Sequence, residues 1–199
     1  IAPSFDQKKG LWQSIPSSIE EVQTIAQIIE GDYLINETAQ KSTFLQSVLD
    51  YNILHLATHA CSNHKNPLHQ SAFVFAAKHG DRDSLIHEYL YAYELYQMQI
   101  NADLAVLSAC ATGTGQLDAG EGLMSLARAF KYAGCSNIVT SLWPANDKVT
   151  KTIMVDFFKN LKGDMGKTSA LQEAKKTYLE HPIVDRTHPS FWATFILIG

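Results

Sequence analysis

The chain has 199 residues, of which 46% are hydrophobic and 18% are charged, and its formal net charge is −4. This composition is typical of one globular domain and excludes an intrinsically disordered chain. Because the charge is negative and no basic run is present, we expect no direct contact with nucleic acid. No apolar stretch approaches the roughly 20 residues that cross a bilayer, so we expect no membrane contact either.

Strand-like and helix-like segments alternate along the chain, which predicts an α/β fold with a mainly parallel sheet. The expected helices are 19–29, 38–49, 90–98, 122–132, 147–161 and 168–179. The expected strands are 32–35, 52–58, 71–77, 103–108, 137–142 and 191–198. Segments such as 52–58 are nearly continuous apolar runs, which is typical of strands buried on both faces of a parallel sheet.

The chain has three cysteines, Cys61, Cys110 and Cys135. Three is too few for a disulfide framework, and the odd number favours a reducing, cytoplasmic compartment. The first ten residues lack the charged and apolar regions of a signal peptide, and they do not begin with Met. We therefore interpret the chain as part of a longer protein.

His59 and Cys110 each follow the carboxyl end of a predicted buried strand. Sites in open parallel sheets form at this edge. A neighbouring imidazole helps to create the thiolate, which is the reactive form of cysteine, and it can protonate a leaving amine. The separation of 51 residues occurs by chance in many α/β chains. The pair is thus a candidate catalytic dyad that needs support from the local sequence.

Five short motifs give that support, in order along the chain: HLATH at 55–59, LSAC at 107–110, GEG at 120–122, SLW at 141–143 followed by Asp147, and HPSFWA at 188–193. Together they resemble the CHAT domain, a caspase-like module that is related to separase and often attached to tetratricopeptide repeats. The resemblance runs from about Ser14 to Gly199. It implies a caspase-hemoglobinase-like fold, an α/β/α sandwich with a mainly parallel central sheet. We expect residues 1–199 to form a single CHAT domain whose first strands lie upstream in the parent protein.

The resemblance also implies cysteine endopeptidase chemistry, with no cofactor and no metal. It assigns the base to His59, the nucleophile to Cys110, and the oxyanion hole to the backbone N–H groups of Cys110 and Ala60. A similar segment of separase carries an Asp that receives the arginine before the cut bond, so Asp147 would line the S1 pocket and favour a basic residue there. Trp143 is a candidate wall of the same pocket. The expected partners are a protein or peptide substrate and a regulatory partner or attached repeat domain.

Three alternatives remain open for individual residues. Asp147 begins a predicted helix, where Asp is also favoured as an N-cap. His55 lies four residues before His59, hence on the same face of an extended strand, and is better interpreted as a core histidine. Cys61, His64 and His69 cluster in sequence, but their spacing matches no standard zinc site, so a polar loop is the plainer interpretation.

Two departures from the family pattern keep other functions open. The family usually has Gly where this chain has Ala60, and Glu where it has Ala111. An alanine is strained if position 60 needs a positive φ. One rival is therefore a catalytically degenerate CHAT domain that acts as a protein-interaction scaffold. The other is a thiol-dependent acyltransferase or amidohydrolase, which would have a small-molecule pocket at Cys110.

Overall fold

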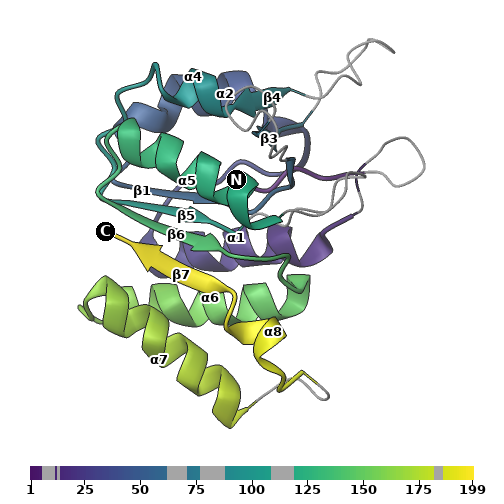
Figure 1. Ribbon diagram of the computed structural model, residues 1–199, viewed down its shortest axis with the longest axis vertical. Helices are drawn as coiled ribbons and strands as arrows, with labels where there is room; N and C mark the ends of the chain where they lie inside the picture. Colours follow the sequence, from purple (N-terminus) through teal and green to yellow (C-terminus); the bar gives the residue numbers. More distant parts are fainter. Residues whose placement is uncertain (6–11, 13, 62–70, 77–87, 109–118, 182–185) are drawn as a thin grey trace.

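A four-stranded sheet forms the centre of the molecule in the computed structural model (Figure 1). The structure describes residues 1–5, 12, 14–61, 71–76, 88–108, 119–181 and 186–199, and of residues 119–122 it describes the backbone only. The strands lie in the order β1 (Ile53–Leu56), β5 (Leu104–Leu107), β6 (Asn137–Ser141) and β7 (Phe195–Ile198). The first three are parallel, and β7 runs antiparallel to β6. The predicted α/β class and mainly parallel sheet are confirmed.

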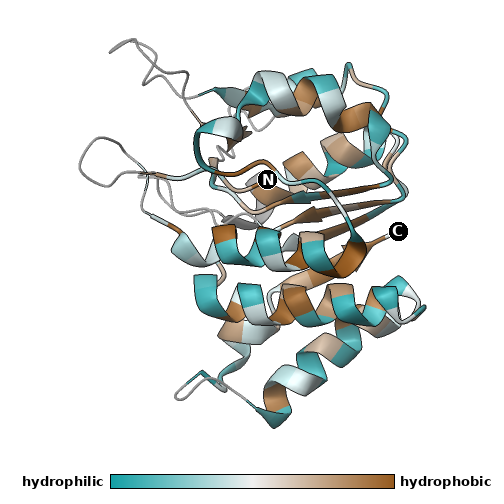
Figure 2. Cartoon of the chain, turned by 180° about the vertical axis from the view of Figure 1, so that it is seen from behind, coloured by the Kyte–Doolittle hydropathy of each residue, from teal (hydrophilic) through white to brown (hydrophobic). Residues whose placement is uncertain are grey.

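Helices cover both faces of this sheet (Figure 1). One face packs against α2 (Lys41–Ser47), α4 (Ala92–Leu95) and α5 (Ala119–Tyr132). The other packs against α1 (Pro16–Ile29), α6 (Asp147–Lys162) and α7 (Lys167–Glu180). Alternate residues of β5 enter the two cores: Ala105 and Leu107 face α5, whereas Leu104 and Val106 face α6. Burial on both faces explains why the strands are continuous apolar runs, which appear as brown arrows between the helices in Figure 2.

A second, smaller sheet lies beyond the carboxyl end of β1. It contains β2 (Ala60–Cys61), β3 (Ala72–Val74) and β4 (Tyr89–Tyr91), which pair antiparallel in that order. Strands of two or three residues carry no periodic pattern, so the sequence did not separate this sheet from the central one. The segment predicted as helix 90–98 instead completes β4 and then forms only the single turn of α4.

Two further predictions of strands were wrong in part. The segment 32–35 contributes one isolated bridge, between Ile35 and Ala2, and the 3-10 turn η1 (Asn36–Thr38) follows it. A second 3-10 turn, η2 (Val48–Asp50), directly follows α2. The segment 191–198 divides into the helical turn α8 (Pro189–Trp192) and β7. Pro189 suits the first position of a helix, and His188 caps it by accepting the Ser190 N–H through Nδ1 at 3.2 Å.

Candidate active site

The carboxyl ends of β1, β5 and β6 meet at one edge of the central sheet. Parallel pairing aligns Leu56 of β1 with Leu107 of β5, and Leu107 with Thr140 of β6. His59 follows β1 by three residues, and Trp143 follows β6 by two. The described part of the segment after β5 ends at Ser108, whose N–H donates to the Leu56 carbonyl at 3.1 Å. The residue order thus brings three predicted site segments to neighbouring strands.

His59 is fully buried, and two aromatic rings hold its imidazole. The Phe5 ring meets it edge-on, with 4.5 Å between ring centroids, and the Trp12 ring stacks on it at 5.1 Å. We call Phe5 and Trp12 the aromatic clamp. Both residues are themselves buried in a small cluster with Val74. Edge-on and stacked ring contacts of this kind favour one orientation of the imidazole.

The segment from 55 to 59 is not one continuous strand, which corrects the expectation that His55 and His59 share a face. The strand β1 ends at Leu56, and the His59 carbonyl already accepts the Val74 N–H, at 2.9 Å, in the small sheet. His55 packs instead against Phe158 of α6, with 5.4 Å between ring centroids. The period-2 rule fails here because the chain changes sheets between the two histidines.

Ala60 occupies an extended position in β2, opposite Phe73. Positive φ values among described non-glycine residues occur at Glu30, Asn36 and Asp164, and not at Ala60. The alanine therefore carries no left-handed backbone strain. Since the Val74 N–H bonds to His59, the pair Ala60–Phe73 is a non-hydrogen-bonded pair of the ladder, and the Ala60 N–H points away from β3, toward the outer edge of β2.

Cys110 lies outside the described residues, so its contribution to the dyad and to the oxyanion hole stays a prediction; Ala111, His64 and His69 lie outside them as well. The other two thiols are described. Burial raises the pKa of Cys61, whose Sγ lies 3.6 Å from the Ala72 carbonyl. Burial also raises the pKa of Cys135, in the core, to about 11. Both are protonated at neutral pH, and thiols in that form are poor nucleophiles.

Asp147 is half-buried at the start of α6, but it is not the N-cap of that helix. Asn146 has this role, since its Oδ1 accepts the Val149 N–H at 3.4 Å. Asp147 reaches another helix: its Oδ2 accepts the Ser17 N–H in the first turn of α1, at 3.0 Å. A carboxylate at a helix N-terminus satisfies an unpaired N–H and suits the helix dipole. One carboxylate oxygen thus serves α1, and the S1 role stays a prediction.

Trp143 is half-buried and fixed by the C-terminal segment. Its indole N–H donates to the Ser190 carbonyl at 2.8 Å. Its own carbonyl accepts the Thr194 hydroxyl at 2.8 Å. The HPSFWA motif therefore holds the residue that we predicted as a wall of the S1 pocket.

A buried polar cluster lies beneath this edge of the sheet, and we call it the Glu21 cluster (Glu21, His55 and Ser108). Glu21 of α1 is 1% exposed, and its Oε1 lies 2.7 Å from His55 Nε2. The same oxygen accepts the Ser108 hydroxyl at 3.0 Å. Burial lowers the pKa of His55, and the neighbouring carboxylate opposes that shift. His55 Nδ1 is buried without a hydrogen-bond partner among the described residues.

Sequence reasoning missed the aromatic clamp and Glu21. Nothing in the sequence relates Phe5 or Trp12 to His59, because both contacts depend on the tertiary fold. Glu21 did carry a signal. The buried positions of α1 are 18, 21, 22 and 25, a helical stripe, so a Glu at position 21 falls on the apolar face.

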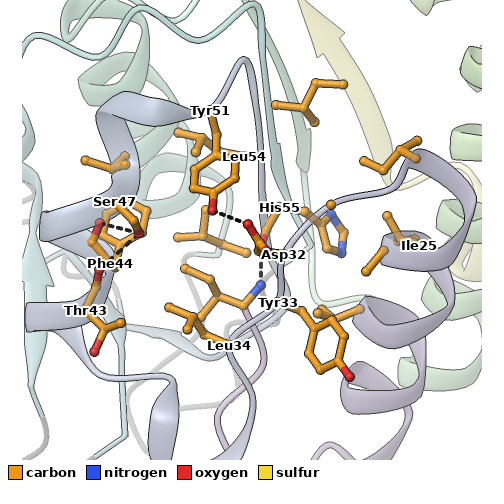
Figure 3. Close-up of a pocket in the computed structure, with 18 of the residues that line it drawn as sticks. Ile25, Asp32, Tyr33, Leu34, Thr43, Phe44, Ser47, Tyr51, Leu54 and His55 are labelled. Atoms are coloured by element: carbon orange, nitrogen blue, oxygen red, sulfur yellow. Dashed lines mark hydrogen bonds between the residues drawn. The ribbon is translucent and has the colours of Figure 1, made fainter.

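An apolar pocket of about 400 Å³ lies beside β1, between α1 and α2 (Figure 3). Its walls include Ile25 of α1, Phe44 of α2 and Leu54 of β1. Tyr51, also in the lining, donates its hydroxyl hydrogen to Asp32 at 2.6 Å. The lining does not include His59, Ala60, Trp143 or Asp147, so this pocket is separate from the candidate site.

Comparison with known proteins decides the family. The model of the CHAT domain family matches residues 2–199. The chain belongs to the CHAT domain family. This CHAT domain has the mixed α/β architecture of the caspase-like module that its motifs implied. The described part of the CHAT domain contains no group of three or more His, Cys, Asp or Glu residues suited to a metal ion. No helix within the described ranges is long and apolar enough to cross a membrane.

Two relatives of this CHAT domain are proteins named tetratricopeptide repeat protein 28. The mouse protein is 25% identical over 225 aligned residues, and the human protein is 26% identical over 224. Each alignment covers 99% of the chain but 9% of the relative. The CHAT domain therefore spans a small part of the curated relatives it matches.

Proposed function

We propose that this CHAT domain is a cysteine endopeptidase in which Cys110 is the nucleophile and His59 the base. The observation that carries the proposal is the placement of His59, buried and oriented by the aromatic clamp at the edge where β1 and β5 end together. Cys110 comes two residues after Ser108 in the sequence, and Ser108 directly follows β5, the strand next to β1. Catalytic residues at the carboxyl ends of adjacent parallel strands are the usual arrangement in such sheets.

In the proposed reaction, His59 accepts the Cys110 thiol proton as sulfur attacks the carbonyl carbon of the peptide bond. The tetrahedral oxyanion would accept hydrogen bonds from the backbone N–H groups of Ala60 and Cys110, and the outward direction of the Ala60 N–H supports this role. His59 then gives the proton to the leaving amine, which leaves a thioester on Cys110. A water molecule, deprotonated by His59, attacks the thioester and releases the carboxylic acid and the thiol.

Asp147 would supply the preference for a basic residue before the cut bond, with Trp143 beside it. Both residues follow β6, the strand next to β5. Asp147 Oδ1 makes no hydrogen bond to another described residue, so an arginine side chain could pair with it while Oδ2 keeps its bond to Ser17. The substrate would be a protein or peptide, and an attached repeat domain or a bound partner would regulate access. The tetratricopeptide repeats named in the relatives support that regulatory partner.

The test uses the parent protein with a positional-scanning library of fluorogenic peptides. Turnover after Arg or Lys that disappears in Cys110→Ala would support the dyad. Asp147→Asn keeps an oxygen for the Ser17 N–H but removes the charge, so we expect the preference for Arg over neutral residues to fall about 10- to 100-fold. Asp156→Asn is the matched control and should keep the preference, since Asp156 lies on the same helix and forms an ion pair with the exposed Lys159.

Two results would contradict the proposal. A Cys110→Ala variant that still cleaves would exclude Cys110 as the nucleophile. An absence of turnover, together with Cys110 labelling no faster than Cys61 and Cys135 under any candidate activator, would favour the scaffold function suggested by Ala60 and Ala111.

A further inference from the structure

The Glu21 cluster connects three elements through one oxygen atom. Glu21 extends from α1 toward the central sheet, and its Oε1 contacts His55 in β1 and Ser108 directly after β5. The side chains of Glu21 and His55 are 1% and 8% exposed. No other carboxylate of the described residues is bonded to both β1 and the residue that follows β5.

Ser108 fixes the point where the chain leaves the sheet toward Cys110. Its N–H donates to the Leu56 carbonyl at 3.1 Å, which continues the parallel ladder between β1 and β5 by one residue. Its hydroxyl also lies 3.4 Å from the same carbonyl and donates to Glu21. The backbone and the side chain of Ser108 are therefore both held, two residues before the proposed nucleophile.

Stability alone does not explain a carboxylate at this position. Burying a charged group is costly even when it is paired, and apolar replacements of buried ion pairs are often neutral or stabilising. The neighbours of Glu21 on the same stripe of α1, Val22 and Ile25, are apolar and buried. What Glu21 adds, and an apolar side chain would not, is a directed link between α1 and the two strand ends.

The same helix has a second link to the candidate site. The Ser17 N–H in the first turn of α1 donates to Asp147, the proposed S1 residue. Glu21 lies one helical turn further along α1. A shift of α1 relative to the sheet would therefore disturb Ser108 and Asp147 together.

We infer that Glu21 is a positioning residue for Cys110, an inference that rests on the function proposed above. Through Ser108, its carboxylate holds the end of β5, from which the chain continues to Cys110, and we expect this anchor to govern the reactivity of that thiol toward its base. Misplacement of a reacting group by about 1 Å can lower a rate about 100-fold. The contribution of Glu21 is thus expected in the reactivity of Cys110 more than in the stability of the fold.

The decisive variant is Glu21→Leu in the parent protein, which removes both hydrogen bonds and replaces the carboxylate by an apolar side chain of similar size. We expect the rate constant for alkylation of Cys110 by iodoacetamide to fall about 10- to 100-fold. The midpoint of its pH profile should rise toward the 8.5 or so of an ordinary thiol, because the thiol is no longer paired with His59. Glu21→Gln, which keeps an oxygen acceptor for Ser108, should recover most of the rate.

The matched control is Glu20→Gln, the neighbouring carboxylate of α1, which is exposed and pairs with Lys151. It should leave the alkylation rate and its pH profile unchanged. Urea denaturation of each variant gives the folded fraction, to which the rates are normalised. If Glu21→Leu does not fold, Ser108→Ala carries the test, and we expect a decrease in the same range, about 10- to 100-fold, because it removes the link between Glu21 and the end of β5.

Each outcome separates this inference from the proposed function. Slower alkylation in Glu21→Leu, or in Ser108→Ala, without any peptide cleavage by the wild type would support the positioning role and contradict the endopeptidase. Cleavage and alkylation that stay within twofold of wild type in the folded variants would contradict the positioning role and leave the endopeptidase standing. A wild-type Cys110 that reacts no faster than Cys135 would overturn both.

Discussion

His55 and His59 belong to one five-residue motif, yet they lie in two different environments. His55 sits inside β1 and bonds to the buried carboxylate of Glu21. His59 lies past the strand end, in the small sheet, where Phe5 and Trp12 hold its ring. The carboxylate of a neighbouring helix thus ties His55 to the fold, whereas aromatic rings from the first residues of the chain pack on His59. The comparison indicates that the position relative to the strand end, not the residue type, separates a structural histidine from a candidate base.

The largest effect is expected at His59. His59→Ala should lower kcat/KM by about 10³-fold, since a general base contributes on the order of 10² to 10⁴ to a rate. The measurement is turnover of the best library peptide, normalised to the folded fraction from urea denaturation. A loss below tenfold in the folded variant would show that His59 is not the base.

His55 should affect mainly stability. His55→Leu leaves the buried Glu21 carboxylate without its nearest partner, so we expect the free energy of unfolding to fall by about 3 kcal/mol. The exposed His181 at the end of α7 gives the control, because His181→Leu should change stability by less than about 0.5 kcal/mol. Equal urea midpoints for the two variants would mean that the Glu21–His55 contact stabilises nothing.

The same contact predicts a pH dependence. Burial lowers the pKa of His55 below the 6.5 of a free histidine, so below about pH 6.5 the unfolded chain binds a proton that the folded chain does not. Stability should therefore fall as pH decreases from 7.5 to 5.5. Among the described side chains, the carboxylate of Glu21 is the titratable group that faces His55, and it opposes the effect of burial on the His55 pKa. The His55 contribution is the difference between wild type and His55→Leu, and parallel pH profiles would contradict it.

The smallest effect is expected beside His59, at position 60. Ala60 has no positive φ, so Ala60→Gly restores the usual family residue without relieving strain. We expect kcat/KM within about twofold of wild type, and a loss of up to about 1 kcal/mol in stability because glycine weakens a strand. A tenfold gain in activity would indicate that the working site needs a backbone conformation at 60 that differs from the extended one.

Much of the central sheet could be predicted because its elements are long or uniformly apolar. The continuous runs at 103–108 and 137–142 became β5 and β6, and the helical periodicity at 147–161 and 168–179 became α6 and α7. The small sheet was not predicted, since two or three residues contain no full period of alternation. The helical turn α8 was not predicted either, because the apolar run at 191–198 is typical of a strand. The local signals for the turn are Pro189 at its first position and the capping residue His188 before it.

The placement of the motif segments was predictable, while the roles of their residues stay predictions. Five ordered motifs led to His59, Ala60, Trp143 and Asp147, and the fold brings the segments that carry them to neighbouring strands. The support around these residues was not predictable, because Phe5, Trp12 and Glu21 come from distant segments. Their contacts depend on how α1 and the first residues pack against the sheet, which no local spacing encodes.

The position of β1 at the edge of the central sheet has a consequence for handling the protein. Within the part of the chain that the structure describes, one side of β1 pairs with β5, while on the other side Ile1 bonds to His55 and to Ala57, the residue after the strand. The peptide groups of Ile53 face the unpaired side, next to an apolar pocket. The strand Ile-Leu-His-Leu carries neither lysine nor proline, the residues that natural edge strands use against intermolecular pairing. A strand side of this kind can pair with a further strand, so activities are best compared among samples of equal dilution.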